Sequence, residues 1–312
     1  MQIITYHQLK DKTDLFLLWA KSFGWLCTPK QMEHWVKTDI RLTGTPVGVC
    51  AIIDDKLAGF VGIMEIPTRN KHGETEIVGG IWAVATRPSF ARQGVGGRLL
   101  EAAENHFRQK GFRLSMLTTS RAFIAHRGYV SFGYREVEIV NNYPHFYKVP
   151  RRSAKADPFP PEPKGKAVKL DLGKIGRLFE NYTRNRCGFT IREIGTMQER
   201  QDMGFYFEPR SSVVLDDGYL LAGKQMGSVW ISEVIASSQK TARELLRRSA
   251  ATSTAGIFAR SVFDPEIARL LGKLGYRRDP GAYGVLMAKP LTDVPFDDIY
   301  DDTFLFTAVE SI

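Results

Sequence analysis

A basic, glycine-rich turn follows an apolar segment in the first third of the chain. The turn reads Arg92-Gln93-Gly94-Val95-Gly96-Gly97-Arg98, and the apolar run before it ends at Pro88. This order predicts a strand, a tight turn and a helix, with free backbone N–H groups at the positive end of the helix. Glycines let the backbone approach a ligand closely, and Arg92 and Arg98 add positive charge. The spacing therefore favours binding of a phosphate or pyrophosphate.

Two common phosphate motifs do not fit this turn. A dinucleotide fingerprint needs a third glycine where the chain has Leu99, and a Walker loop needs a Gly-Lys-Ser/Thr sequence that is absent. The segment from Ala83 to Gly97, A-V-A-T-R-P-S-F-A-R-Q-G-V-G-G, instead resembles the acyl-CoA pyrophosphate loop of the GNAT superfamily of N-acetyltransferases. Thr86 stands where that family usually has Val, and Ala91 where it usually has Arg or Gln. The V-A-T-x-P wording resembles the branch of the enhanced-intracellular-survival acetyltransferases.

A second motif stands at the distance that the same family requires. Tyr129-x-x-Phe132-Gly133-Tyr134 resembles the family's Tyr-x-x-x-Gly-Phe/Tyr, in which the tyrosine lies on the helix after the fifth strand and faces the thioester sulfur. That strand is expected at residues 114–119. Tyr129 alone could equally be a half-buried aromatic residue of the core, but the loop and the tyrosine in this order resemble a GNAT domain.

The resemblance implies acetyl-CoA as co-substrate and assigns residues to it. Backbone groups of the fourth strand, at Val84, Ala85 and Thr86, would hold pantetheine and polarise the thioester carbonyl. The turn would bind the pyrophosphate, through Arg92, Gln93, Gly94, Val95, Gly96, Gly97 and Arg98. The face of the next helix would border pantetheine with Ala122, Phe123, Ala125 and His126. Many family members have an Asn near Ala122, so this chain lacks one side-chain hydrogen bond to pantetheine.

Amide formation from a thioester requires a neutral amine, a polarised carbonyl and a proton for the leaving thiolate. Tyr129 is the expected general acid, and Glu76 is the expected general base through a water molecule. Glu65 and His72 are alternatives for the base, as is the carboxylate of Ile312. Each of these side chains could also be an ordinary solvated residue at the end of a strand.

The composition bounds the class of protein. The chain has 312 residues, of which 43% are hydrophobic and 25% charged, as in ordinary globular domains. Three scattered cysteines predict neither disulfides nor a metal site, and we expect no metal. No apolar run reaches the ~20 residues that cross a membrane, and the first residues lack a secretion signal. We therefore expect a cytoplasmic protein that does not contact a membrane.

The net charge of +9 is unevenly distributed, because the last 22 residues carry −6. The basic remainder could bind nucleic acid, but no helix-turn-helix, zinc spacing or aromatic RNA-binding motif accompanies it. Binding of the anionic CoA accounts for part of the charge, so nucleic acid is not the expected partner.

The sequence predicts a duplication. Residues 151–166 form a break rich in Pro and Lys, and the segment 51–59 before it is echoed by 214–223 after it. We expect a GNAT domain at 1–150, a linker at 151–166, a degenerate GNAT-like domain at 167–290 and an acidic-aromatic tail at 291–312. The fold class is then α/β (α+β), with two tandem domains that each have a mixed, mostly antiparallel sheet flanked by helices.

The two copies differ where the cofactor would bind. The second copy has Ser237-Ser238-Gln239-Lys240-Thr241-Ala242 in place of the glycines, and Leu271 in place of Tyr129. We therefore expect only the first copy to bind acetyl-CoA and to catalyse.

The acceptor is predicted to be the amine of a small molecule or a peptide. Aromatic residues on the two early predicted helices are mostly core residues, and one or two of them could line a pocket for a hydrophobic or cationic amine. These residues are Phe16, Trp19, Phe23, Trp25 and Trp35. In the tail, aromatic residues alternate with four aspartates, which predicts docking on the chain's own body or on a second subunit of a homodimer. Two other functions stay open, namely transfer of another acyl or aminoacyl group and a non-catalytic scaffold.

Overall fold

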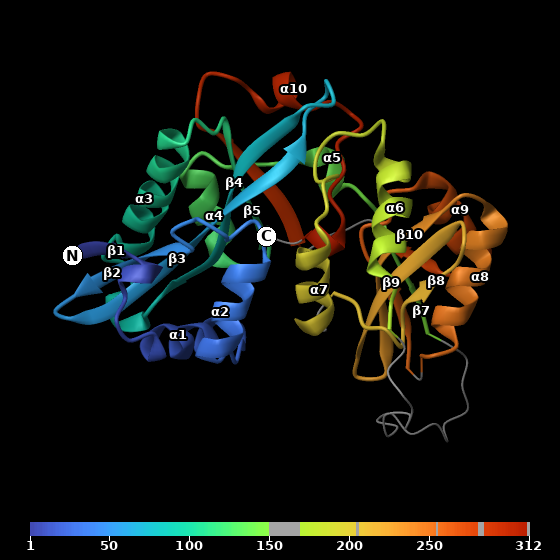
Figure 1. Cartoon of the computed structure of the whole chain (residues 1–312), viewed down its shortest axis with the longest axis horizontal. Helices are drawn as coiled ribbons and strands as arrows, with labels where there is room; N and C mark the ends of the chain where they lie inside the picture. Colours follow the sequence, from blue (N-terminus) through green and yellow to red (C-terminus); the bar gives the residue numbers. More distant parts are fainter. Residues whose placement is uncertain (150–168, 204–205, 254, 280–283, 311–312) are drawn as a thin grey trace. The chain divides into compact units, whose positions relative to one another are not determined.

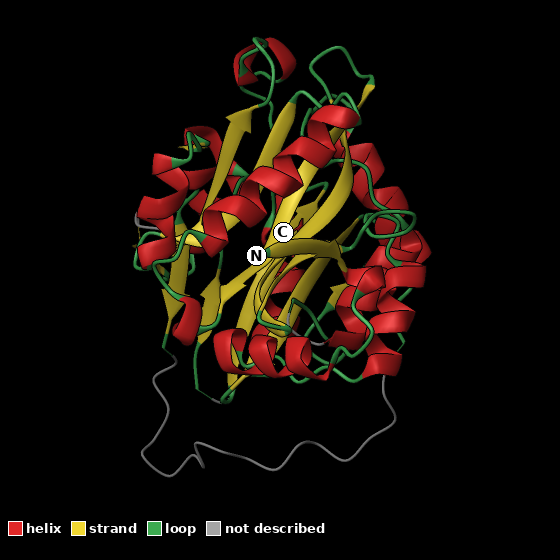
Figure 2. Ribbon diagram, turned by 90° about the vertical axis from the view of Figure 1, so that its left-hand side faces the viewer, coloured by secondary structure: helices red, strands yellow, loops and turns green. Residues whose placement is uncertain are grey.

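The computed structural model describes residues 1–149, 169–203, 206–253, 255–279 and 284–310, which form two compact units (Figure 1). The first unit contains Met1–Val137 and Gly284–Asp301, and the second contains Glu138–Tyr283 and Asp302–Ser311. Each unit has one mixed sheet with helices packed on it (Figure 2), which confirms the predicted fold class. The predicted linker, 151–166, lies outside the described residues.

The first unit is built on a seven-stranded sheet in the order β1-β2-β3-β4-β5-β13-β6. The strands are β1 (Gln2–Thr5), β2 (Gly48–Ile53), β3 (Lys56–Arg69), β4 (Thr75–Thr86), β5 (Leu114–Ser120), β6 (Arg135–Glu136) and β13 (Gly284–Pro290). The helices are α1 (Thr13–Phe23), α2 (Pro29–Thr38), α3 (Val95–Gln109), α4 (Ile124–Ser131) and α10 (Phe296–Ile299), with 3-10 turns at Tyr6–Gln8 and Pro88–Phe90. Only β4 and β5 pair in parallel.

The second unit has a six-stranded sheet in the order β12-β7-β11-β10-β9-β8. The strands are β7 (His145–Lys148), β8 (Val213–Val214), β9 (Gly218–Gln225), β10 (Ser228–Ala236), β11 (Ile257–Ala259) and β12 (Arg277–Asp279). The helices are α5 (Glu138–Asn141), α6 (Leu172–Thr183), α7 (Ile194–Met203), α8 (Gln239–Ala250) and α9 (Pro265–Lys273), with a 3-10 turn at Ala308–Glu310. The parallel pair is β10 with β11, the counterpart of β4 with β5.

Each sheet contains one strand that comes from the other half of the sequence. In the first sheet β13, from the end of the chain, lies between β5 and β6. In the second sheet β7, which directly follows the first unit in sequence, lies between β11 and β12. Each unit therefore receives its penultimate strand from the other half of the sequence.

The exchange makes the units differ from the boundaries predicted at residues 150 and 290. Strand β7 precedes residue 150 but belongs to the second unit, and β13 precedes residue 290 but belongs to the first. The first half of the chain does not supply a long last strand of its own, since β6 is short and α5 follows it. The place beside β5 that a last strand of the first half would take is filled by β13.

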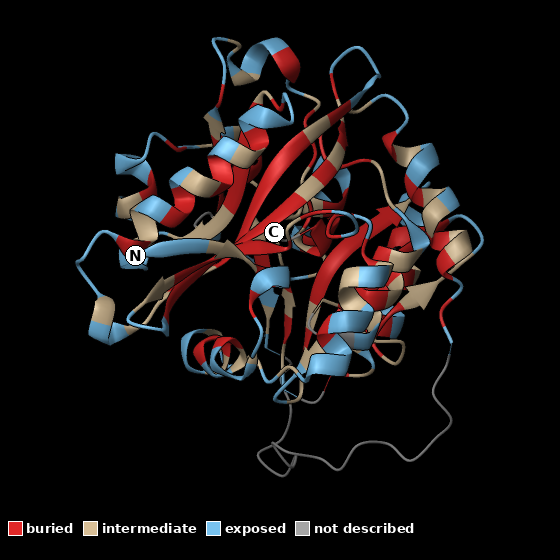
Figure 3. Cartoon of the chain, turned by 60° about the vertical axis from the view of Figure 1, so that its left-hand side comes forward, coloured by how far each residue is buried: buried red, intermediate tan, exposed pale blue. Residues whose placement is uncertain are grey.

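The core of the first unit rests on the amphipathic helix α3. Its apolar face is buried against the sheet through Val95, Leu99, Leu100, Ala103 and Phe107. Each of the four larger side chains, Ala103 excepted, contributes about 1.5–3 kcal/mol on burial. Strand β4 has a glycine below the largest of them, because a Cβ atom on Gly79 would lie 2.4 Å from the ring of Phe107. In Figure 3 most residues of the sheets are buried, as this packing requires.

The tail is packed against its own chain. Tyr300 is 1% exposed in the first unit, and Phe304 and Leu305 are fully buried in the second. The aspartates between the aromatic residues, at 297, 298, 301 and 302, are exposed. Of the two predicted docking modes, the structure has the tail on its own chain, with Tyr300 and Phe304 inward and with Phe296 and Phe306 partly exposed.

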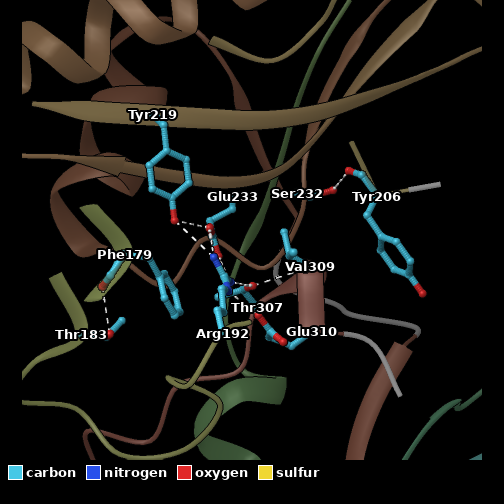
Figure 4. A network of polar contacts seen from close by, with 10 residues as sticks. All are labelled: Phe179, Thr183, Arg192, Tyr206, Tyr219, Ser232, Glu233, Thr307, Val309 and Glu310. Atoms are coloured by element: carbon cyan, nitrogen blue, oxygen red, sulfur yellow. Dashed lines mark hydrogen bonds and ion pairs between the residues drawn. The ribbon is translucent and has the colours of Figure 1, made fainter. Parts of the chain in front are cut away.

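The tail also closes a buried ionic network in the second unit (Figure 4). The Arg192 guanidinium donates to both oxygens of Glu233, over 2.8 and 2.6 Å, and its Nε donates to Glu310 near the end of the chain. Tyr219 donates to the same Glu233, and the ring of Phe179 lies 3.4 Å from the guanidinium carbon. Burial alone opposes the charge of Arg192, but the two carboxylates outweigh it and raise its pKa.

Candidate functional site

Strands β4 and β5 separate in the middle of the first sheet. They pair in parallel only from Gly79 to Ile81 on β4 and from Ser115 to Leu117 on β5. Both strands continue past the last pair, β4 as far as Thr86 and β5 as far as Ser120, without pairing with each other. Backbone polar groups of these two segments therefore face an opening between the strands.

A β-bulge marks the start of this opening. Opposite β4, Gly62 pairs with Trp82 and Phe60 pairs with Ala85, so that Ala83 and Val84 together face the single residue Val61. Ala83 has a φ of +48°, which is unusual for a residue with a side chain. Such bulges re-aim side chains and end regular pairing beside active sites. The structure thus places Val84, Ala85 and Thr86, the predicted pantetheine-binding segment, directly after the bulge.

The glycine-rich turn forms the N-terminus of α3, as the sequence predicts. Gly94 is the N-cap residue with φ +76°, and no side chain caps the helix. The N–H groups of Val95, Gly96 and Gly97 have no acceptor among the described residues. The helix dipole adds to their positive character, so an anion is their natural partner.

Open space surrounds the first two glycines of the turn. A Cβ atom on Gly94 would meet nothing within 4 Å, and one on Gly96 would meet only the hydroxyl oxygen of Thr86, at 3.6 Å. Gly97 differs, because a Cβ there would lie 2.8 Å from the ring of Phe132. Gly97 is therefore required for packing of α3 on the end of α4, whereas Gly94 and Gly96 leave room for a ligand.

The polar side chains of the turn, Arg92, Gln93 and Arg98, are exposed. Arg92 and Arg98 form no ion pair within the part of the chain that the structure describes, and Arg92 has a φ of +60°. Gln93 donates its side-chain amide to the carbonyl of Ser89, over 3.2 Å, and so braces the turn from outside. Within the described residues, two guanidinium groups without an ion pair thus lie beside three N–H groups without an acceptor, an arrangement that favours an anion.

Tyr129, on α4, belongs to the same buried cluster as Val95 of α3 and Ile81 and Leu117, the last pair before the strands separate. Burial raises the pKa of its phenol to about 12, so the hydroxyl keeps its proton at neutral pH. Within the described ranges the hydroxyl has no hydrogen-bond partner, and it is not sealed from solvent. A protonated, unpaired phenol that remains accessible can deliver a proton.

The other predicted residues of α4 lie at its start. Ala122 and Phe123 are exposed, and Ala125 packs against the core. The ring Nε2 of His126 lies 2.8 Å from Glu136, which also pairs with Arg121. Hydrogen bonds from Arg121 and then from His126 lower the pKa of Glu136. His126 is thus held by a carboxylate rather than free for proton transfer.

Glu76 is not brought to this opening. It lies at the start of β4, seven residues before Ala83, which corresponds to ~23 Å along a strand. Both of its oxygens pair with Arg113, and it is 9% exposed. Glu65 is also engaged, since His106 and Lys110 lie 3.1 and 3.3 Å from it. The candidate base Ile312 lies outside the described residues.

An aromatic cluster covers β4 beside the bulge, on the face of the sheet that points away from α3. Trp82 packs on Trp19, Trp35 and Phe60, with ring centroids 5.0–5.7 Å apart. The predicted cluster divides here, because Phe16 joins Trp19 while Phe23 pairs with Trp25. Sequence reasoning missed Trp82, although its position one residue before Ala83 in the recognised segment could have indicated it.

The second unit keeps the strand geometry but closes the helix end. Between Ile231 and Glu233, β10 has a register shift at the position that matches the bulge of β4. The helix after it, α8, is capped by the Ser238 hydroxyl, which accepts from the N–H of Thr241. Asp217 accepts hydrogen bonds from Ser237 and Thr241, and these lower the pKa of its carboxyl group. A side-chain cap and a carboxylate thus occupy the place of an anion.

The described part of the chain has neither a membrane-spanning helix nor a cluster of metal-binding side chains. No described helix is both long and apolar enough to cross a membrane. The described residues also hold no group of three or more His, Cys, Asp or Glu side chains arranged to bind a metal ion.

Comparison with known proteins agrees with this geometry. Residues 13–134 match the acetyltransferase (GNAT) family. A GCN5-related N-acetyltransferase of Kribbella flavida is similar over 93% of this chain and 72% of its own, with 20% identity and a TM-score of 0.63. A GCN5-related N-acetyltransferase of Anabaena variabilis gives 15% identity and a TM-score of 0.62 over 93% of this chain and 73% of that one. Eis1 of Mycobacterium abscessus gives 14% identity and a TM-score of 0.57 over 93% of this chain and 73% of its own. At these identities the likeness concerns the fold, and no curated protein sequence matches the chain.

Proposed function

Because residues 13–134 are a GNAT acetyltransferase domain within a chain of two GNAT-like units, we propose that the protein is an N-acetyltransferase. It transfers an acetyl group from acetyl-CoA to a primary amine, by direct attack while both substrates are bound. The observation that carries the proposal is the uncapped N-terminus of α3 at the end of the strand that separates from β5. The family's use of acetyl-CoA matches a site with free N–H groups, free guanidinium groups and a protonated phenol.

Different residues of the site would have different roles, according to their position. The N–H groups of Val95, Gly96 and Gly97, with Arg92 and Arg98, would hold the pyrophosphate. Backbone groups of Val84–Thr86 would pair with pantetheine and polarise the carbonyl. When bound, acetyl-CoA supplies the acetyl group as an activated thioester. Tyr129 would give its phenolic proton to the leaving sulfur.

The amine has to lose its proton before it attacks. Glu76 stands at the other end of β4 in an ion pair with Arg113, so we propose that it anchors the start of this strand and does not act as the base. The substrate amine would then arrive as the free base, with its proton passed to solvent. The aromatic cluster around Trp82 and Trp35 favours a hydrophobic or cationic amine, from a small molecule or a peptide.

Calorimetric titration of Gly96→Asp with acetyl-CoA and with CoA tests the proposal. The substitution puts a carboxylate and its Cβ into open space beside the free N–H groups, so we expect binding to weaken at least a hundredfold. An aspartate in the first turn of a helix is favourable, so the fold should not suffer. The matched control is Gly176→Asp in α6, where a Cβ also meets nothing within 4 Å.

The expected result is one micromolar site per chain in the wild type and in Gly176→Asp, and none in Gly96→Asp. Two sites per chain would contradict the proposed loss of binding by the second unit. A wild type that binds neither ligand would overturn the acetyltransferase proposal and favour a scaffold. Tight binding of CoA without turnover of acetyl-CoA across an amine panel would favour another acyl donor.

A further inference from the structure

A row of polar side chains crosses the second sheet on the face opposite α8 and α9. The registers place Asp279 of β12 opposite His145 of β7, and Ile231 of β10 opposite Ala259 of β11. One position beyond the last regular pair, Ala259 with Phe146, Arg260 follows beside His145 and next to Ser232. Neighbouring side chains on one face of a sheet lie about 5 Å apart. Ser232 is also the bulged residue of β10, at the counterpart of the opening in the first unit.

Arg260 is half-buried, and its charge has no counter-ion among the described residues. Its Nη2 donates to the Ser232 hydroxyl over 2.8 Å, while its Nε is buried and unpartnered. No described carboxylate lies within ion-pair distance of it. Ser232 in turn donates to the backbone carbonyl of Tyr206 (Figure 4), so its hydroxyl is fixed as an acceptor toward Arg260. Burial lowers the pKa of Arg260, which reflects the cost of this isolated charge.

His145 adds unused hydrogen-bonding capacity beside this charge. Both ring nitrogens are buried and unpartnered in the described structure. Burial lowers the pKa of the imidazole, the carboxylate of Asp279 opposes this shift, and Arg260 lowers the pKa further; the net shift is downward, so the ring is neutral at pH 7 and offers one N–H donor. The contrast with Arg192 in the same unit is direct, since that guanidinium is fully paired with two carboxylates.

An aromatic surface continues the row. The ring of Phe258 is stacked on His145, with centroids 5.5 Å apart, and Trp230 meets Phe258 edge-on at 5.0 Å. The Arg260 guanidinium carbon lies 5.8 Å from the Trp230 ring. All four side chains are only half-buried, which distinguishes this face from the sealed core on the other side of the sheet.

We propose that this cluster binds a small organic acid, with its carboxylate on Arg260 and His145 and its apolar part on Trp230 and Phe258. A buried cation without a partner is costly, and a bound anion offsets that cost. One uncompensated positive charge matches the single charge of a carboxylate better than the double charge of a phosphate. The planar guanidinium also suits a carboxylate geometrically. This site is independent of acetyl transfer in the first unit.

Calorimetric titration of the full chain with phenylacetate, and with inorganic phosphate at equal ionic strength, tests this proposal. We expect one site for phenylacetate that weakens at least tenfold in Arg260→Met. The control is Arg269→Met, which removes an exposed arginine of α9 from the same unit and should bind as the wild type does. Thermal unfolding without ligand gives a second readout, because removal of an unpaired buried charge should leave the unfolding temperature of Arg260→Met equal to or above that of the wild type.

Three results would overturn the proposal. They are absence of phenylacetate binding to the wild type, equal binding by Arg260→Met, and phosphate binding tighter than that of phenylacetate. A lower unfolding temperature of Arg260→Met without any binding by the wild type would assign Arg260 a purely structural role. We expect Arg260→Met to bind CoA as the wild type does. Failure of the organic-acid proposal can therefore be told apart from failure of the proposed acetyltransferase function.

Discussion

The Tyr129 phenol is buried, and its hydroxyl has no hydrogen-bond partner among the described residues, which leaves it available to a substrate. Its hydroxyl accepts and donates no hydrogen bond within the described chain, whereas its neighbour Tyr134 is bound to Ser115 over 2.7 Å. Both phenols are buried, yet only that of Tyr129 is free to meet a substrate. The sequence motif contains both tyrosines, and the difference between them comes from packing.

Tyr129→Phe should reduce kcat by about 10²- to 10⁴-fold, the range typical for loss of a general acid, with CoA affinity unchanged. Steady-state turnover with the best amine of a panel and calorimetry with CoA measure the two quantities. Tyr147→Phe, an exposed tyrosine of β7, serves as the control. Full activity of Tyr129→Phe would remove the proposed acid from the mechanism.

The raised pKa of Tyr129 also predicts a pH profile. A general acid must be protonated, and a phenol with a pKa of about 12 stays protonated through pH 10. The rate should therefore rise with pH as the substrate amine loses its proton, and then stay level up to pH 10. A fall in kcat/KM between pH 8 and 10, with the protein still folded, would show that the acid has a much lower pKa.

At the scale of elements, α3 and α8 occupy equivalent places in the two units, but their N-termini differ. Gly94 leaves the N-terminus of α3 open, whereas Ser238 and Asp217 close that of α8. This difference follows from local residue types, so it could be predicted from the sequence. The bulge at Ala83 was not predictable in the same way, because an apolar strand of this composition also fits a regular sheet.

The exchange of β7 and β13 could not be predicted for a related reason. Both strands are short, and neither sequence, His145–Lys148 or Gly284–Pro290, indicates which sheet it joins. Which strand fills which place depends on long-range pairing, which the order of the repeats does not reveal. The predicted role of Glu76 as the base depends on a distance, because the length of β4 separates this residue from the opening.

The exchange predicts crossed effects of core substitutions. Met287→Ala in β13 should cost about 2–5 kcal/mol of the stability of the first unit, and Phe146→Ala in β7 about 3–5 kcal/mol of that of the second. Hydrogen exchange resolves the two units, through amides of β5 and of β11. Faster exchange in β11 after Met287→Ala, with β5 unchanged, would contradict the pairing.

At the scale of the whole molecule, the end of the chain fastens the second unit. Deletion of residues 302–312 removes three buried apolar side chains, Phe304, Leu305 and Val309, each contributing about 1.5–3 kcal/mol. It also takes Glu310 from Arg192. We expect a lower unfolding temperature and a smaller urea midpoint.

Asp297→Asn/Asp298→Asn is the control for the deletion, because it lowers the acidity of the tail at exposed positions and should change stability by less than about 0.5 kcal/mol. A deletion variant as stable as the wild type would show that the packed tail contributes nothing. Sedimentation of the same variants tests the predicted homodimer, which should dissociate on deletion if the tail joins two chains.

The exchanged strand also sets the order of events during translation. The ribosome adds β13 about 150 residues after β6, so at roughly 5–20 residues per second it follows ~10–30 s later. Until then β5 emerges as an unpaired edge next to the proposed cofactor site. The half that is synthesised first is therefore completed only after nearly the whole chain has been made, and we expect the edge of β5 to need protection during this interval.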